Sequence, residues 1–111
     1  MKTYTAAVVG LSQISQGRLP KPRSLSATDP MPRSHVSAYA AHPRVKLVGA
    51  CDLMPAAREK FNATWRDAHP DTRLYSDYRE MLEKEKPDIV SVITPDDKHA
   101  DIVVDAANRG V

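Results

Sequence analysis

Cysteine, aromatic residues and long apolar runs are all scarce in this 111-residue sequence, and each shortage excludes a class of protein. The single cysteine, Cys51, has no partner for an internal disulfide, so we expect a reducing compartment, the cytoplasm. Aromatic residues make up 5% of the chain, too few for the stacked side chains that bind single-stranded nucleic acid. No stretch approaches the ~20 apolar residues that span a bilayer. We therefore expect neither a nucleic-acid nor a membrane partner.

The sequence motifs of metal sites, P-loops and serine hydrolases are also missing. No cysteine pair or close histidine pair has metal-ligand spacing, so no metal site is predicted. There is no Gly-Lys-Ser/Thr of a P-loop and no Gly-x-Ser-x-Gly elbow for a nucleophilic serine. We accordingly nominate no catalytic residue in this chain.

The charge is small overall but unevenly distributed. The net charge is +2, which is not the balance of a nucleic-acid-binding domain. Four basic side chains and four of the nine prolines fall within residues 16–33, where all periodicity is lost. We expect an irregular insertion there. Its basic groups could contact a phosphate or a partner, although a solvated loop is the simpler interpretation.

The rest of the chain alternates between strand and helix patterns. Short apolar or β-branched runs predict strands at residues 4–10, 45–51, 74–75 and 88–94. Helical patterns occupy residues 34–41, 56–68, 78–84 and 97–108. This alternation predicts a Rossmann-like, doubly wound parallel sheet in three α/β/α layers. A fifth strand would be required after residue 111, so the fold is expected to be incomplete at its C-terminus.

Local signals define some helix ends and faces. Ser34 is expected to cap the first helix, and Pro55 to lie in the first turn of the second. Asp77 and Glu80 have the spacing of a capping box. The clearest buried strand is expected at 88–94. The face of the last helix expected to turn inward consists of Ala100, Val103, Val104 and Ala107, with Gly110 as its stop signal.

The first strand ends at Gly10, where a dinucleotide-binding turn would begin. Such a turn has glycine at its first, third and sixth positions, and here these are Gly10, Ser12 and Ser15. Only the glycine of the tight turn is kept. The Ser12 hydroxyl could donate a hydrogen bond to a phosphate, or its bulk could weaken binding. An ordinary strand-to-loop turn remains the alternative.

An acid follows the second strand at Asp52. A carboxylate there can accept hydrogen bonds from the hydroxyls of an adenosine ribose. Without the insertion, Asp52 follows Gly10 at close to the usual interval of about 20 residues. The carboxylate repels a 2′-phosphate and so favours NAD over NADP, although Arg58 or the basic insertion could offset this repulsion. The alternatives are a solvated acid or a helix cap ahead of Pro55.

Several segments resemble the N-terminal domain of the glucose–fructose oxidoreductase/inositol dehydrogenase (Gfo/Idh/MocA) family. The most specific are YSDYREML from Tyr75, KPDIVSVITP from Lys86 and HADIV from His99. Residues 8–11, 34–39 and 45–52 match as well. The resemblance implies a Rossmann domain that binds NAD, with NADP also possible. It further implies an oxidoreductase that transfers a hydride between nicotinamide and a carbinol carbon of a sugar, polyol or related compound.

The resemblance also assigns site residues and indicates what the chain lacks. It places Thr94, Pro95, Asp96 and His99 at the nicotinamide side. With the glycine turn and the acid, the expected cofactor contacts are Gly10, Ser12, Gln13 and Ile14 at the pyrophosphate and Asp52 at the ribose, and Leu11 is also expected to bind the cofactor. Without the resemblance, His99 reads as a surface histidine in a first helical turn. The family's Glu-Lys-Pro motif with its catalytic lysine, and its substrate domain, are not in this sequence. We therefore expect residues 1–111 to be a partial cofactor domain, inactive alone, of a homo-oligomeric parent.

Two other interpretations stay open. Some members of the family act as regulators that sense a nucleotide or sugar with the same fold, and the altered glycine turn is compatible with such a non-catalytic binding module. An inactive fragment is the third interpretation.

Overall fold

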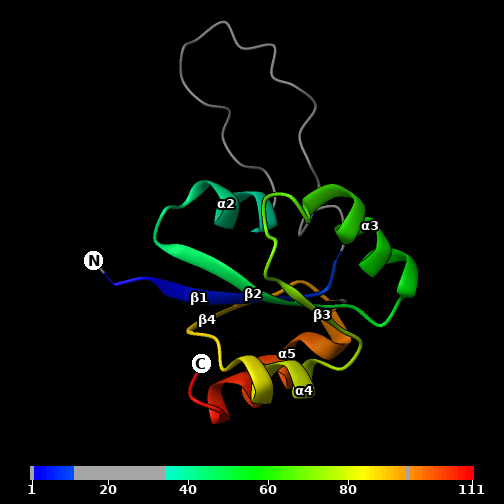
Figure 1. Ribbon diagram of the computed structural model, residues 1–111. Coiled ribbons are helices and arrows are strands. Elements are labelled where there is room, and N and C mark those ends of the chain that lie inside the picture. The colour runs from blue at the N-terminus through cyan, green and yellow to red at the C-terminus, as the bar shows by residue number, and fades with distance from the viewer. Residues whose placement is uncertain (1, 12–34, 95) are drawn as a thin grey trace, which may run out of the picture.

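The alternating strands and helices that the sequence predicts are present in the computed structural model (Figure 1). It describes residues 2–11, 35–94 and 96–111. The strands are β1 (Tyr4–Val9), β2 (Val45–Cys51), β3 (Arg73–Tyr75) and β4 (Ile89–Val92). The helices are α2 (His35–Ala41), α3 (Pro55–Trp65), α4 (Tyr78–Glu85) and α5 (Asp96–Asn108). The proposed insertion at 16–33 and the cap at Ser34 lie outside the described residues.

All four strands are parallel, in the order β3-β2-β1-β4. The chain builds outward from β1 through β2 to β3, and then crosses back to place β4 on the other side of β1. The strand order therefore reverses between β1 and β4. In open parallel sheets, this reversal opens a crevice at the carboxyl ends of the two strands, and ligands bind there. The predicted Rossmann-like doubly wound sheet is confirmed.

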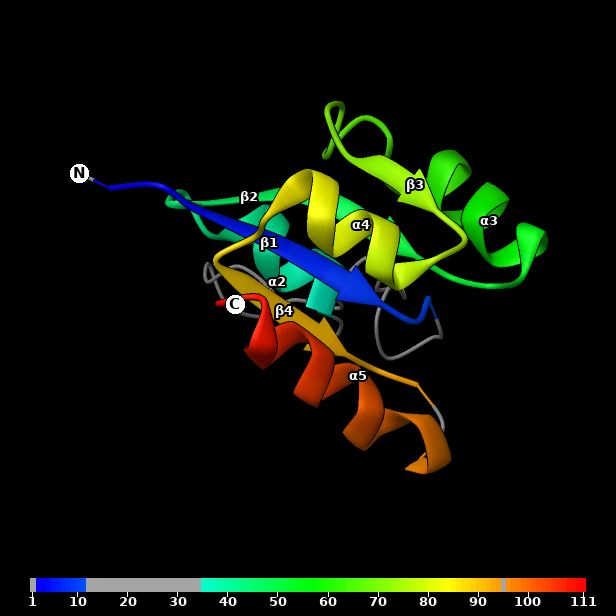
Figure 2. The same ribbon diagram turned by 90° about the horizontal axis from the view of Figure 1, so that it is seen from below.

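Helices cover both faces of the sheet, so the fold has three layers (Figures 1 and 2). Successive side chains of a strand point to opposite faces. Ala6 and Val8 of β1 thus pack into one apolar cluster with α2 and α3, and Ala7 and Val9 into another with α4 and α5. The buried contributions from the helices are Val36, Phe61 and Trp65 on the first face, and Met81 and Ile102 on the second. Cys51 is buried in the second cluster, as expected of a small apolar residue.

The predicted inward face of the last helix is wrong. Val103 and Val104 are 43% and 56% exposed, and Ala100 and Ala107 are exposed as well. The residues that pack on the sheet are Ile102 and Ala106, each at most 4% exposed. Both sets have helical spacing, because α5 carries apolar residues around most of its circumference. Periodicity alone could not choose between the two faces.

Two predicted elements also differ in length or environment. α3 ends at Trp65 and not at residue 68. In the turn that follows, the Arg66 side chain donates hydrogen bonds to backbone carbonyls, including that of Thr72 at 2.7 Å. β4 is a strand of four residues at the edge of the described sheet, and its Ile89 is 39% exposed. The buried strand expected over 88–94 is thus shorter than predicted and only partly buried, with Ser91 buried and Val90 and Val92 half-buried.

The helix ends follow the sequence signals in part. Asp77 caps α4 by accepting a hydrogen bond from the Arg79 N–H at 2.9 Å. Glu80 pairs with Lys84 at 2.8 Å instead of completing the capping box. Gly110 ends α5 with φ of +81°, and the Val111 N–H bonds the Ala106 carbonyl in a Schellman motif.

Candidate dinucleotide site

The carboxyl ends of β1, β2 and β4 lie at one edge of the sheet, where Figure 2 shows the arrowheads of β1 and β4 side by side. Gly10 follows β1, Asp52 follows β2, and Thr94 comes two residues after β4. α5 also begins on this side, at Asp96, because it runs back from the end of β4. The predicted site residues that the structure describes therefore come from three loops at the same edge.

Gly10 occupies a position that only glycine fits. Its φ is +97°, in a region that L side chains rarely adopt. A Cβ at Gly10 would lie 2.1 Å from the Ile93 carbonyl oxygen, so the end of β4 passes directly against this turn. The Gly10 N–H donates to the Cys51 carbonyl at 2.8 Å. The predicted role of Gly10 in a tight turn is thus explained by its contact with the neighbouring strand ends.

Asp52 joins this turn to the start of α3. Its Oδ2 accepts a hydrogen bond from the Leu11 N–H at 2.8 Å, and its Oδ1 accepts one from the Met54 N–H at 2.8 Å. The alternative of a merely solvated acid is therefore wrong. The other alternative, a helix N-cap ahead of Pro55, is also wrong, because the N-cap of α3 is Met54 and Asp52 bonds the N–H of that residue from outside the helix. Each carboxylate oxygen keeps a further lone pair for another donor.

Neither the N–H nor the side chain of Leu11 is placed to contact a ligand directly. Its N–H is bonded to Asp52, and its side chain is 4% exposed within the cluster that faces α2 and α3. Its part in the site is to hold the turn against the acid. Ser12, Gln13, Ile14 and Pro95 lie outside the described residues, so their predicted contacts stay predictions.

Arg58 supports the loop after β2 without neutralising its acid. The guanidinium donates to the backbone carbonyl of Asp52 at 2.7 Å and to that of Leu53 at 3.3 Å. The nearby thiol of Cys51 has its pKa raised to about 12, mainly by burial and then by the Asp52 and Asp77 carboxylates, with Arg58 opposing them. The expected thiol chemistry is therefore that of an inert, protonated side chain.

Thr94 carries a buried hydroxyl with no hydrogen-bond partner among the described residues. An unsatisfied buried hydroxyl costs roughly 1–3 kcal/mol. The residue lies beside the glycine turn, since its methyl carbon would be 3.4 Å from a Cβ at Gly10. A buried hydroxyl without a partner beside the Gly10 turn fits a polar ligand such as a dinucleotide.

His99, in the first turns of α5, is tethered to β4. Its Nε2 lies 2.8 Å from the Val92 carbonyl oxygen, which can only accept, so this nitrogen carries the proton. The side chain is nevertheless exposed. It is therefore a surface histidine, as the plain alternative had it, but one that is held at the edge where Thr94 lies.

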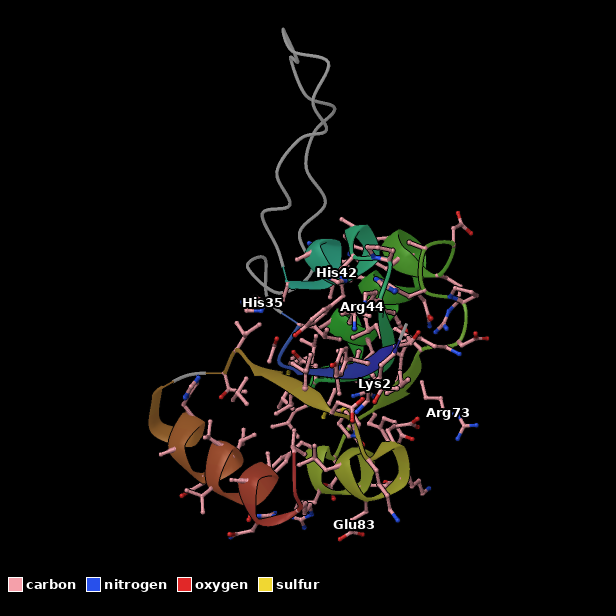
Figure 3. All side chains as sticks on the ribbon, turned by 90° about the vertical axis from the view of Figure 1, so that its left-hand side faces the viewer. Lys2, His35, His42, Arg44, Arg73 and Glu83 are labelled. Carbon is pink, nitrogen blue, oxygen red and sulfur yellow. The ribbon has the colours of Figure 1, made fainter. Side chains whose placement is uncertain are left out.

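A polar cluster that the sequence analysis did not single out lies between α2 and β4. The Ser91 hydroxyl, on β4, is bonded to His35 Nδ1 at 3.0 Å and to the Tyr39 hydroxyl. The available signal was a serine inside an otherwise apolar strand. Figure 3 shows His35 next to the end of β4.

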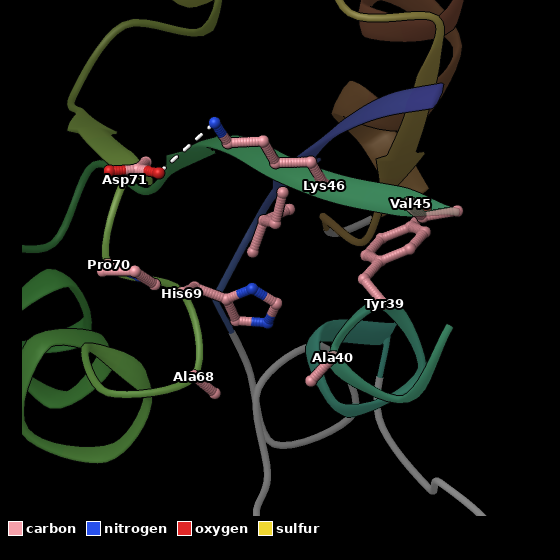
Figure 4. Close-up of a pocket in the computed structure, with 9 residues that line it drawn as sticks. Tyr39, Ala40, Val45, Lys46, Ala68, His69, Pro70 and Asp71 are labelled. Carbon is pink, nitrogen blue, oxygen red and sulfur yellow. Dashed lines mark ion pairs between the residues drawn. The ribbon is translucent and has the colours of Figure 1, made fainter. Parts of the chain in front are cut away.

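The hollow in Figure 4 lies at the opposite end of the sheet, beside the start of β2. It has a volume of about 140 Å³ and is lined by residues that include Tyr39, Val45 and His69. At its rim, Lys46 and Asp71 form an exposed ion pair of 3.3 Å. His69 is buried, its Nε2 lies 3.1 Å from the Val36 carbonyl oxygen, and burial lowers its pKa. The hollow is separate from the candidate site.

The described residues offer neither a metal site nor a membrane-spanning helix. In that part of the chain, no group of three or more histidine, cysteine or acidic side chains could hold a metal ion. None of the helices described there is long and apolar enough to cross a membrane.

A parallel sheet with order 3-2-1-4, a glycine turn after β1 and an acid after β2 together define a Rossmann-type nucleotide-binding domain. The family described as an oxidoreductase family with an NAD-binding Rossmann fold (GFO_IDH_MocA) matches residues 29–111. The chain belongs to this family. The match begins after the turn at Gly10. No curated protein matches the chain.

Solved structures agree on the fold. The WlbA dehydrogenase from Bordetella pertussis, solved with NADH and UDP-GlcNAcA, is 24% identical with a TM-score of 0.72, and the match covers 99% of this chain and 27% of that one. Scyllo-inositol dehydrogenase from Lactobacillus casei, solved with NAD(H) and scyllo-inositol, is 21% identical with a TM-score of 0.67, and the match covers 98% of this chain and 26% of that one. Myo-inositol 2-dehydrogenase from Lactobacillus plantarum is 22% identical with a TM-score of 0.68, and the match covers 99% of this chain and 26% of that one. The chain thus spans about a quarter of the length of these structures.

Proposed function

We propose that residues 1–111 form the cofactor domain of an oxidoreductase and bind NAD at the carboxyl edge of the sheet. The hydrogen bond between Asp52 and the Leu11 N–H carries this proposal, because it joins the acid after β2 to the glycine turn after β1, and that turn borders the point between β1 and β4 where the strand order reverses. The unpartnered hydroxyl of Thr94 supports it from the β4 side. Bound NAD would supply a nicotinamide ring that accepts or donates a hydride.

Each predicted residue has a task in this proposal. Asp52 accepts the ribose hydroxyls with its remaining lone pairs while it holds the turn. The backbone after Leu11, from Ser12 to Ile14, approaches the pyrophosphate. The loop of Thr94, Pro95 and Asp96, with His99, borders the nicotinamide.

The proposed preference is for NAD over NADP. The Asp52 carboxylate repels a 2′-phosphate, and no ion pair with Arg58 neutralises it, since that guanidinium bonds backbone carbonyls. Opposite or like charges a few ångströms apart at a protein surface interact by a few kcal/mol at most. We expect NADP to bind at least about tenfold more weakly than NAD.

The reaction proposed for the whole protein is hydride transfer between nicotinamide and a carbinol carbon of a sugar, polyol or related compound. The similar solved structures support this substrate class, because two are named as inositol dehydrogenases and the third is a dehydrogenase solved with a nucleotide sugar. We further propose that this chain binds the cofactor without turnover, because the family's catalytic lysine is not in its sequence. We also propose that the protein is cytoplasmic, that residues 16–33 are an insertion, and that the whole protein is a homo-oligomer.

A non-catalytic binding module is the second candidate. The serines at positions 12 and 15, where the dinucleotide turn has glycine, favour it. Both candidates bind a dinucleotide, so binding alone does not separate them. Hydride transfer by a longer protein that contains this domain would support the enzyme.

Calorimetric titration of the folded chain with NAD and NADP tests the binding proposal. We expect weak binding that prefers NAD, and a loss of about tenfold or more in NAD affinity for Asp52→Ala. Asp71→Ala is the matched control, because it removes an equal charge at the opposite end of the sheet. If neither nucleotide binds the folded wild-type chain at millimolar concentration, the proposal is wrong.

A further inference from the structure

The Ser91 hydroxyl is the meeting point of two side chains from α2. Ser91 is 9% exposed, and its Oγ bonds both His35 Nδ1, at 3.0 Å, and the Tyr39 hydroxyl. His35 and Tyr39 are four residues apart, so they lie on the same face of α2. We call these three residues the clasp.

The clasp lies between β4 and α2, on the face of the sheet that packs into the apolar cluster with α2 and α3. On β4, Val90 and Val92 face the α4 and α5 side, whereas Ser91 and Ile93 face α2 and α3. The Ser91 hydroxyl is removed from water there and must be hydrogen-bonded to be tolerated, and its partners are the half-buried Tyr39 and the exposed His35. Apolar side chains would hold α2 to the sheet as well. What the hydrogen bonds add is direction, since they fix the orientation of β4 relative to α2.

The clasp begins a series of contacts that fix the chain as it leaves β4. After Ser91, the Val92 carbonyl accepts from His99 Nε2, and the Ile93 N–H donates to the Val9 carbonyl at 2.8 Å. The next residue, Thr94, has the unpartnered hydroxyl. The adenosine side of the site, at Asp52, is held by different bonds, to Leu11 and Met54.

We propose that His35, Tyr39 and Ser91 are positioning residues that set the loop after β4 for the nicotinamide half of the dinucleotide. This proposal rests on the proposed function. The three residues act through β4 and touch none of the adenosine-side residues in the hydrogen bonds described above. Breaking the clasp should therefore weaken recognition of nicotinamide and leave recognition of the rest of the cofactor unchanged.

Titration with NAD and with ADP-ribose, which lacks the nicotinamide ring, separates the two halves. We expect Ser91→Ala to weaken NAD binding about 3- to 10-fold, as for the loss of one or two hydrogen bonds, and to change ADP-ribose binding less than twofold. Tyr39→Phe keeps the ring and should show a smaller loss of the same kind; it carries the test if Ser91→Ala does not fold. His35→Asn, whose amide can replace Nδ1, should retain NAD affinity, whereas His35→Leu should not.

The outcomes distinguish this inference from the function on which it rests. Equal weakening of both ligands by Ser91→Ala and Tyr39→Phe would show a purely structural role and overturn the clasp proposal. Unchanged affinities in both variants would also overturn it. If the wild-type chain binds NAD and ADP-ribose equally well, nicotinamide is not recognised and the clasp proposal is wrong, while dinucleotide binding stands. If the wild-type chain binds neither, both proposals are wrong.

Discussion

The Asp52 carboxylate and the Leu11 N–H are joined by a 2.8 Å hydrogen bond across 41 positions of sequence. With the bond from Met54, it ties together the ends of two neighbouring strands and the start of a helix. We expect Asp52→Ala to lower the free energy of unfolding by about 1–2 kcal/mol, because two backbone donors lose a charged acceptor near the surface. Asp52→Asn keeps one acceptor oxygen and should cost less.

Urea denaturation followed by circular dichroism measures this loss. Asp71→Ala serves again as control and should stay within about 0.5 kcal/mol of the wild type, as an exposed ion pair contributes little. Equal stabilities of the Asp52→Ala and wild-type chains would contradict the bridging role of Asp52.

Gly10 and Gly110 form a matched pair for a second prediction, since both have positive φ. A Cβ at Gly10 would meet the Ile93 carbonyl oxygen at 2.1 Å, whereas a Cβ at Gly110 would have nothing within 4 Å. Gly110→Ala should therefore cost about 1 kcal/mol, for backbone conformation alone. Gly10→Ala should cost about 2–5 kcal/mol, because steric overlap with β4 adds to the same strain.

Thermal and urea unfolding of the two variants give this comparison. Gly10→Ala should also lose NAD binding in whatever fraction remains folded, because β4 has to move away from the turn. Equal destabilisation by the two substitutions would mean that the contact with Ile93 does not constrain the turn.

The alternating pattern could predict the parallel sheet and its three layers, because buried strands and amphipathic helices have distinct periods. It could also predict that Gly10, Asp52 and Thr94 share one edge, since parallel strands all end on the same side. It could not select the inward face of α5, whose apolar residues lie on several sides. It could not reveal that the Leu11 N–H donates a hydrogen bond to Asp52, because that pairing depends on the register of β1 against β2.

The clasp shows a further limit of sequence reasoning. None of the residues Ser91, His35 and Tyr39 signals a function by itself in the sequence. The serine interrupts an apolar strand, but it is not part of a recognised sequence motif. Only the packing of α2 across the sheet brings them within hydrogen-bond distance.

Arg58 provides a third prediction, on cofactor preference. Its guanidinium is bonded to the carbonyls of residues 52 and 53, so it supports the loop. We expect these bonds to keep it from binding a 2′-phosphate. Arg58→Met should lower stability by about 1 kcal/mol through lost hydrogen bonds to a part-buried carbonyl. The ratio of NAD to NADP affinity should change less than about twofold, which corresponds to roughly 0.4 kcal/mol. A selective loss of NADP affinity, measured by calorimetry, would show that Arg58 neutralises the phosphate.

His69 provides the last prediction, on the pH dependence of stability. Burial lowers the pKa of its imidazole, so the folded chain holds this side chain neutral while the unfolded chain protonates near the ordinary value of about 6.5. At pH below that value the unfolded state binds more protons, and stability must fall as the pH falls. The slope for one group is at most about 1.4 kcal/mol per pH unit.

Urea unfolding at pH 7.5 and at pH 5.5 tests the sign and the origin of this effect. The wild-type chain should be less stable at pH 5.5. His69→Gln cannot titrate but can still donate to the Val36 carbonyl, and it should lose most of the difference between the two pH values. The carboxylate of Asp105, whose pKa is lowered by the Tyr78 hydroxyl and then by nearby arginines, titrates below this window and does not contribute to it. An unchanged pH dependence in His69→Gln would assign the effect to other groups and contradict the prediction.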